Sequence, residues 1–199
     1  MKSYPLINRV LHALFALMMV FQLVSEELMK RPKLVDGAPR VRSDEQILFF
    51  DLHEWFGITL LIIVGLRLSL LLGNPDEVRK LFPFTSVEGI RGIIAELKEV
   101  PGWFAGKLRA PSDDDHIAGL VHGLGLLLGL AMGLTGVTMF IGMDPVNGTM
   151  DQFVHVMKEI HEVLGELLFY YVIGHVAMAL VHQLKGHRPL QRISPLSKE

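Results

Sequence analysis

Two histidines lie fourteen residues apart in one apolar stretch near the C-terminal end of the sequence, His161 and His175. In an α-helix, fourteen steps of about 100° bring the second side chain to within roughly 40° of the first, and the rise separates them by about 21 Å. The two imidazoles would therefore share one helix face and lie near opposite surfaces of a membrane. Because ionisable groups inside a membrane-spanning helix are costly, this spacing indicates a helix that serves two cofactors.

The composition places these histidines in a membrane protein. Half of the 199 residues are hydrophobic, and they are gathered into long blocks. The net charge of −2 and the lack of a basic stripe interleaved with aromatic residues argue against a nucleic-acid partner. Cysteine is absent, which excludes disulfides, thiolate-ligated iron–sulfur clusters and covalently attached c-type haem. Any metal must be held by nitrogen or oxygen.

Four segments are long enough to cross about 30 Å of hydrocarbon as helices. We expect one membrane domain over residues 1–199, with spans at about 6–28, 47–72, 117–141 and 160–184. The chain ends and the second loop, counted from Arg67, carry thirteen Lys and Arg residues, whereas the first and third loops carry six. The excess of positive charge on the cytoplasmic side of membrane proteins therefore predicts that both termini are cytoplasmic.

The second loop, about 44 residues over 73–116, is too long to be structureless in a compact chain. Residues Thr85 to Glu88 fit a capping box, and apolar residues follow at helical spacing. These apolar residues are Ile90, Ile93, Ile94 and Leu97. The predicted fold is an all-α, integral membrane four-helix bundle with a short amphipathic helix, over about 86–100, at the cytoplasmic interface.

Depth in the membrane divides four histidines into two pairs. His53 matches His161 at the outer level, and His12 matches His175 at the inner level. Two neutral imidazoles on facing helices, with a flat iron macrocycle between them, are the ligands of an electron-transfer b-type haem. We therefore expect two non-covalent haem b groups with these four histidines as the metal ligands. A zinc site fits less well, because its ligands must converge on one point.

Glycines support this interpretation but have a second explanation. His53 and His161 share the pattern His-Glu-x-x-Gly, which places Gly57 and Gly165 one turn beyond each histidine. A missing side chain there makes room for a porphyrin, although glycine in membrane helices equally allows close helix packing. A single membrane histidine is more often a hydrogen-bonding or proton-relay group than a haem ligand. It is the pairing at two depths that favours haem.

The sequence resembles the bacterial cytochrome b561 family of four-helix, di-haem membrane proteins, which is related to the cytochrome b subunits of hydrogenases and formate dehydrogenases. The resemblance covers all four spans and rests on Asn-Arg-Val-Leu-His at 8–12, on 53–57 and 65–67, and on 158–182. The family carries its haem ligands on spans one, two and four, which implies the same four histidines and a multi-pass protein of the bacterial inner membrane. His122 resembles a histidine of span three that does not bind iron in the family.

Three further residues are candidates for cofactor binding. Arg67 lies fourteen residues after the histidine of span two, shares its face at the inner level, and could pair with a haem propionate. Arg9, one turn before His12, could bind a propionate or a lipid phosphate, or extend to the membrane interface. His182, seven residues after His175, could pass protons to a quinone or contact water or a propionate.

These features predict a cytochrome that carries electrons across the membrane between quinone or quinol and a redox partner, such as a periplasmic cytochrome or a dehydrogenase subunit. Because both irons would be six-coordinate, an electron carrier is favoured over an enzyme. One alternative is a quinone-reducing oxidoreductase that acts on a small molecule such as superoxide, which a basic outer loop would favour. The other is a haem-free membrane anchor. A homo-oligomer is compatible with the sequence, and membrane lipid is an expected partner.

Overall fold

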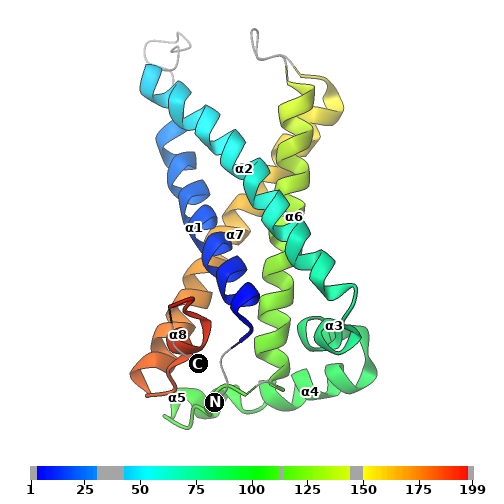
Figure 1. Ribbon diagram of the computed structural model, residues 1–199, viewed down its shortest axis with the longest axis vertical. Coiled ribbons are helices and arrows are strands. Elements are labelled where there is room, and N and C mark those ends of the chain that lie inside the picture. The colour runs from blue at the N-terminus through cyan, green and yellow to red at the C-terminus, as the bar shows by residue number, and fades with distance from the viewer. Residues whose placement is uncertain (1–3, 31–42, 113, 144–149, 197–199) are drawn as a thin grey trace. The chain divides into compact units, whose positions relative to one another are not determined.

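The computed structural model describes residues 4–30, 43–112, 114–143 and 150–196, and every regular element in these ranges is a helix (Figure 1). The four longest are α1 (Leu6–Met29), α2 (Asp44–Leu71), α6 (His116–Gly142) and α7 (Gln152–Leu184). Each is long and apolar enough to cross a membrane. The prediction of an all-α membrane protein with four spans is confirmed.

Two of these helices begin earlier than the apolar pattern predicts, because polar caps start them. At α2, the Ser43 N–H donates to Gln46 Oε1 at 3.0 Å and the Gln46 N–H donates to Ser43 Oγ at 3.3 Å, which is a reciprocal capping box. At α7, the Asp151 carboxylate accepts from the Val154 N–H at 2.8 Å. The 33 residues of α7 extend for about 50 Å, more than the roughly 30 Å of hydrocarbon that a span must cross.

Shorter helices follow α2 and α7. They are α3 (Pro75–Leu81), the 3₁₀ turn η1 (Pro83–Thr85), α4 (Val87–Leu97), α5 (Val100–Phe104) and α8 (Pro189–Ile193). Asn74 caps α3 by accepting from the Glu77 N–H at 3.2 Å, and proline occupies the first turn of α3, α5 and α8. The sequence did not predict α3, which is too short to show an apolar period.

The predicted loop helix is present but is divided into α4 and α5. Its cap is Ser86, whose Oγ accepts from the Gly89 N–H at 3.0 Å. Thr85, the cap expected from the sequence, instead ends η1 and donates its hydroxyl to the Phe82 carbonyl at 2.7 Å. The apolar face of α4 is exposed, as an amphipathic interface helix requires: Val87 is 67% exposed and Leu97 54%. Its cytoplasmic position stays a prediction.

A single carboxylate attaches α4 to the first turn of α6. Glu96 accepts from the backbone N–H groups of His116 and Ile117, each at 2.8 Å, and one of its oxygens lies 2.9 Å from His116 Nδ1. Burial raises the pKa of Glu96, but the hydrogen bonds from these two residues outweigh burial and hold its pKa below the usual value. Glu96 thus caps a spanning helix from outside the span.

The chain forms two compact units, and each long helix contributes a segment to both. Unit 1 comprises residues 1–13, 65–128 and 170–199, and unit 2 comprises 14–64 and 129–169. The core of unit 2 includes the buried side chains of Met19, Leu60 and Val64, and that of unit 1 includes Leu11 and Leu71. The single domain over 1–199 stays a prediction.

Glycines let α6 lie close to its neighbours within each unit. In unit 2, a Cβ added at Gly133 would lie 2.8 Å from Leu61 Cδ1. In unit 1, a Cβ at Gly119 or Gly123 would overlap a backbone carbonyl oxygen at the end of α3. The further pairs of α6 glycine and neighbouring side chain are Gly125 with Tyr171, Gly129 with Phe15, Gly136 with His161, and Gly142 with Val154. Close packing is thus built into α6, as small residues allow in membrane helices.

Candidate functional site

In unit 2, His53 of α2 and His161 of α7 lie opposite each other; we call them the unit 2 pair. Their ring centroids are 6.4 Å apart and their planes differ by 78°. Both side chains are half-buried. Two imidazoles that each bind one shared metal ion through a nitrogen about 2 Å away have their ring centres about 6 Å apart. The spacing therefore fits one ion between the two rings.

The second nitrogen of each ring in the unit 2 pair contacts a buried hydroxyl. His53 Nδ1 lies 2.9 Å from Ser25 Oγ on α1, and His161 Nδ1 lies 2.8 Å from Thr135 Oγ1 on α6. Ser25 is fully buried and Thr135 is 9% exposed. With Nδ1 engaged in both rings, Nε2 is the nitrogen that remains for a metal ion.

Gln22 occupies the space beside the glycine that follows His53. Its Nε2 donates to the His53 backbone carbonyl at 2.9 Å, and a Cβ added at Gly57 would lie 3.3 Å from the same nitrogen. Gly57 thus accommodates a glutamine amide in this structure. The surroundings of Gly165 are more open, because the nearest atom to an added Cβ is the Met132 methyl group at 3.9 Å.

In unit 1, His12 of α1 and His175 of α7 form the unit 1 pair, with ring centroids 6.3 Å apart and planes 43° apart. Two more rings contact His175. Tyr171, one turn earlier, lies nearly parallel to it at 5.7 Å, and His122 of α6 lies edge-on at 5.4 Å. The Tyr171 hydroxyl donates to the Val121 carbonyl at 3.1 Å. Sequence reasoning missed Tyr171.

The two pairs suit a macrocycle better than a bare ion. Within the described residues, no three His, Cys, Asp or Glu side chains are grouped so that they could hold a metal ion. A zinc site needs such convergence, whereas a haem b would need only two imidazole nitrogens from the protein, which each pair could supply.

Arg67 is paired with a residue that the sequence did not single out. Its Nη2 lies 2.5 Å from Glu77 Oε1 of α3, with 15% of the arginine and 26% of the glutamate side chain exposed. Asn8 also donates to this carboxylate, at 3.4 Å. Arg67 Nη1 is buried and has no hydrogen-bond partner among the described residues. One donor of the guanidinium is therefore still available for a carboxylate such as a propionate.

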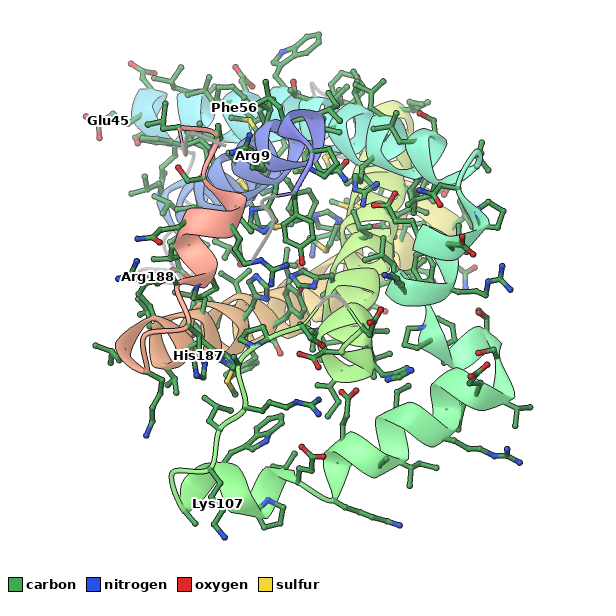
Figure 2. All side chains as sticks on the ribbon, turned by 60° about the horizontal axis from the view of Figure 1, so that its bottom comes forward. Arg9, Glu45, Phe56, Lys107, His187 and Arg188 are labelled. Atoms are coloured by element: carbon green, nitrogen blue, oxygen red, sulfur yellow. The ribbon has the colours of Figure 1, made fainter. Side chains whose placement is uncertain are left out.

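Arg9 holds the C-terminal segment against α1. The residue is 3% exposed, and its Nη1 donates to the Ser194 carbonyl at 3.1 Å, just beyond α8 (Figure 2). A second contact also joins α8 to the N-terminal end of the chain: the Arg192 guanidinium stacks over the Tyr4 ring, with its carbon 5.0 Å from the ring centroid. Arg9 is thus buried in unit 1 rather than extended to an interface.

His182 lies in the last turn of α7 and contacts a histidine of the following loop. Its Nδ1 is 2.9 Å from His187 Nδ1, so one of the two nitrogens must carry the shared proton.

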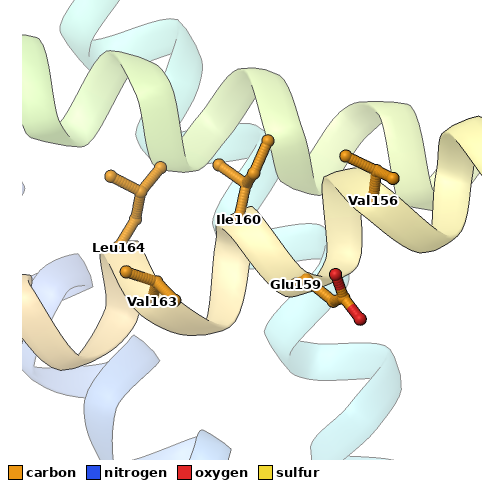
Figure 3. Close-up of a pocket in the computed structure, with 5 residues that line it drawn as sticks. All are labelled: Val156, Glu159, Ile160, Val163 and Leu164. Carbon is orange, nitrogen blue, oxygen red and sulfur yellow. The ribbon is translucent and has the colours of Figure 1, made fainter.

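A hollow on the surface of unit 2 is lined by Val156, Glu159, Ile160, Val163 and Leu164 (Figure 3). None of the candidate ligands lines this hollow.

The four long apolar helices define a multi-pass helical membrane protein, and two pairs of histidines face each other between them. A family model described as prokaryotic cytochrome b561 matches residues 3–195, so the chain belongs to the prokaryotic cytochrome b561 family. Comparisons with curated proteins and with solved structures give no match. Family membership makes the chain a bacterial membrane protein that is embedded in lipid, binds haem b and functions in electron transfer.

Proposed function

We propose that the chain is a di-haem cytochrome that carries electrons across the membrane between the quinone pool and a redox partner protein. His12 and His175 would hold one haem b, and His53 and His161 would hold the other. The observation that carries the proposal is the presence of one ring pair in each unit, with centroids at 6.3 and 6.4 Å. Each pair suits one iron.

A haem iron with two imidazole ligands supplies one-electron transfer and offers no open position to oxygen or substrate. The chain's own contribution is to present the ligand nitrogens and to compensate charge. In unit 1, Glu77 binds Nη2 of Arg67, and Nη1 would be the donor for a propionate. The hydrogen bond from Arg9 to Ser194 keeps the C-terminal segment on the helix that bears His12.

The histidine pair at the end of α7 supports a quinone near unit 1. A quinone takes up protons when it is reduced, and histidine is the side chain that titrates closest to neutrality. His182 and His187 already share a proton across 2.9 Å, so they could pass one on. If both termini are cytoplasmic, as we propose, protons for this site come from the cytoplasm, and a periplasmic cytochrome or a dehydrogenase subunit would exchange electrons on the periplasmic side.

The enzymatic alternative would depend on basic residues of the first loop. The basic residues that would attract superoxide lie mostly at 31–42, outside the residues that the structure describes. Lys30, which precedes them, is bonded to Glu27 at 2.5 Å and lies 3.3 Å from Glu26. Its charge is therefore already compensated. An electron carrier remains the preferred function, with one subunit or a homo-oligomer equally suitable.

The test is a dithionite-reduced minus oxidised spectrum of the purified full chain, expressed with adequate haem supply, together with the haem-to-polypeptide ratio. Two haems per chain are expected. A ratio near zero would refute the proposal and favour a haem-free anchor. Superoxide-dependent quinone reduction by the chain alone, if robust, would instead favour the enzymatic alternative.

A further inference from the structure

We propose that Ser25 and Thr135 are positioning residues for the haem of unit 2. Their hydroxyls accept the Nδ1 proton of His53 and His161, so that both rings present an unprotonated Nε2 to the iron. The inference rests on the proposed haem ligation by His53 and His161, and it adds which groups set the protonation and orientation of these two rings. The experiment below distinguishes a failure of this inference from a failure of the proposed ligation.

The Ser25 hydroxyl has an acceptor for its own proton on α1, in addition to the His53 ring. Ser25 Oγ donates to the Gln22 carbonyl at 3.0 Å, and a carbonyl can only accept. A hydroxyl has one hydrogen, so when that hydrogen goes to the carbonyl, Oγ offers a lone pair to His53 Nδ1 across 2.9 Å. In the arrangement that we propose, Nδ1 therefore carries the ring proton. Because Ser25 is fully buried, water does not compete for this contact.

Thr135 repeats this arrangement on another helix. Its Oγ1 lies 2.9 Å from the Ala131 carbonyl and 3.0 Å from the Met132 carbonyl, so either carbonyl can accept the single hydroxyl proton. The lone pair of Oγ1 then faces His161 Nδ1 at 2.8 Å. Two hydroxyls on two helices thus select the same protonation pattern in both rings of the unit 2 pair.

This pattern affects both geometry and ligand strength. A hydrogen bond from the second ring nitrogen orients a metal-bound histidine and makes it a stronger electron donor. Gln22 adds a second attachment, because its amide holds the backbone carbonyl of His53. In unit 1, the hydroxyl beside the ligand pair is that of Tyr171, and it donates to the Val121 carbonyl instead. The two haems are therefore held by different contacts.

Removal of either hydroxyl should raise the midpoint potential of the unit 2 haem. A weaker donor stabilises ferric iron less, and loss of such a partner typically changes metal affinity or activity by about tenfold or more. A tenfold change in the ferric-to-ferrous equilibrium corresponds to a shift of about 59 mV for one electron. The potential of the unit 1 haem should not change.

The experiment is a redox titration of the purified holoprotein with Ser25→Ala or Thr135→Val. The unit 2 component is assigned as the one missing from His53→Ala. Thr138→Val is a matched control, because Thr138 Oγ1 also donates to a carbonyl one turn earlier, at 2.9 Å from Leu134 O. Ser69→Ala is the equivalent serine control, with Oγ 2.8 Å from Leu66 O.

The inference is supported if the unit 2 potential rises in Ser25→Ala and Thr135→Val, stays constant in both controls, and returns towards the wild-type value in Ser25→Thr and Thr135→Ser. Loss of the unit 2 haem in the alanine or valine variant, with retention in the hydroxyl-bearing variant, supports it equally. Unchanged potentials, or equal shifts in the controls, would overturn it. Absence of haem from the wild-type chain would refute the proposed function instead.

Discussion

The substitution Glu96→Ala should open the first turn of α6 while leaving the membrane spans folded. Glu96 accepts three hydrogen bonds, two from backbone N–H groups that have no partner inside the helix, and its side chain is only 13% exposed. Because the spans are held by lipid and by one another, the loss should appear as local opening at His116 and Ile117 rather than as global unfolding.

The magnitude follows from the contacts that are removed. Loss of a cap costs about 0.5–2 kcal/mol, and loss of a negative charge at a helix N-terminus costs about 0.3–1 kcal/mol. A total of about 1–3 kcal/mol corresponds to a change of roughly 5- to 150-fold in an opening equilibrium. Glu96→Gln keeps one acceptor oxygen and should lie between wild type and Glu96→Ala.

Hydrogen–deuterium exchange of the peptide over 112–120, read by mass spectrometry, measures this opening directly. Exchange at His116 and Ile117 should accelerate by the factor just given. Glu99→Ala is the matched control, since Glu99 precedes α5 without a side-chain capping bond. Equal exchange in Glu96→Ala and Glu99→Ala would refute the claim that the carboxylate holds α4 to α6.

Three further results are expected. Because folding lowers the pKa of Glu96, the stability that its carboxylate gives to the first turn of α6 is complete above the ordinary glutamate pKa and is lost as the pH falls through the lowered, folded value. As the pH falls, amide exchange at His116 and Ile117, corrected for its intrinsic pH dependence, should therefore become faster in wild type but not in Glu96→Gln. Gly123→Ala should destabilise the packing of α3 on α6 by about 1–3 kcal/mol, measured as faster amide exchange in α3. Gly174→Ala is the control and should leave this exchange unchanged, because a Cβ added at Gly174 has no neighbour within 4 Å. His161→Ala should remove the unit 2 haem and leave that of unit 1, and loss of both would argue against the pairing.

The spans and the histidine pairs could be predicted because they depend on local regularities. A run of apolar residues is sufficient to identify a spanning helix, and helical rise gives each histidine a depth, so His53 with His161 and His12 with His175 were the pairs that depth allowed. The structure brings the members of each pair together. Their role as ligands remains a proposal.

The partners of those histidines could not be predicted. Ser25 is 28 residues from His53 and Thr135 is 26 residues from His161, so no helical period connects them. Serine and threonine in helices also commonly bond only a carbonyl one turn earlier, as Thr138 does, which hides the few that contact a second group. The surroundings of Gly57 could not be predicted for the same reason, because the side chain nearest to an added Cβ is that of Gln22, on another helix.

The glycines of α6 determine which mutations the chain can tolerate. None of the four proposed ligands is on α6, yet within residues 125–136 a single methyl group added at any of four positions meets a side chain from another helix. These positions are Gly125, Gly129, Gly133 and Gly136. A saturation library over α6 should therefore show intolerance at intervals of three or four residues, with permissive sites such as the exposed Leu124 and Leu134 between them. A Cβ added at Gly136 would lie 3.2 Å from His161 Cε1, so a substitution on α6 should displace a proposed ligand that α7 carries.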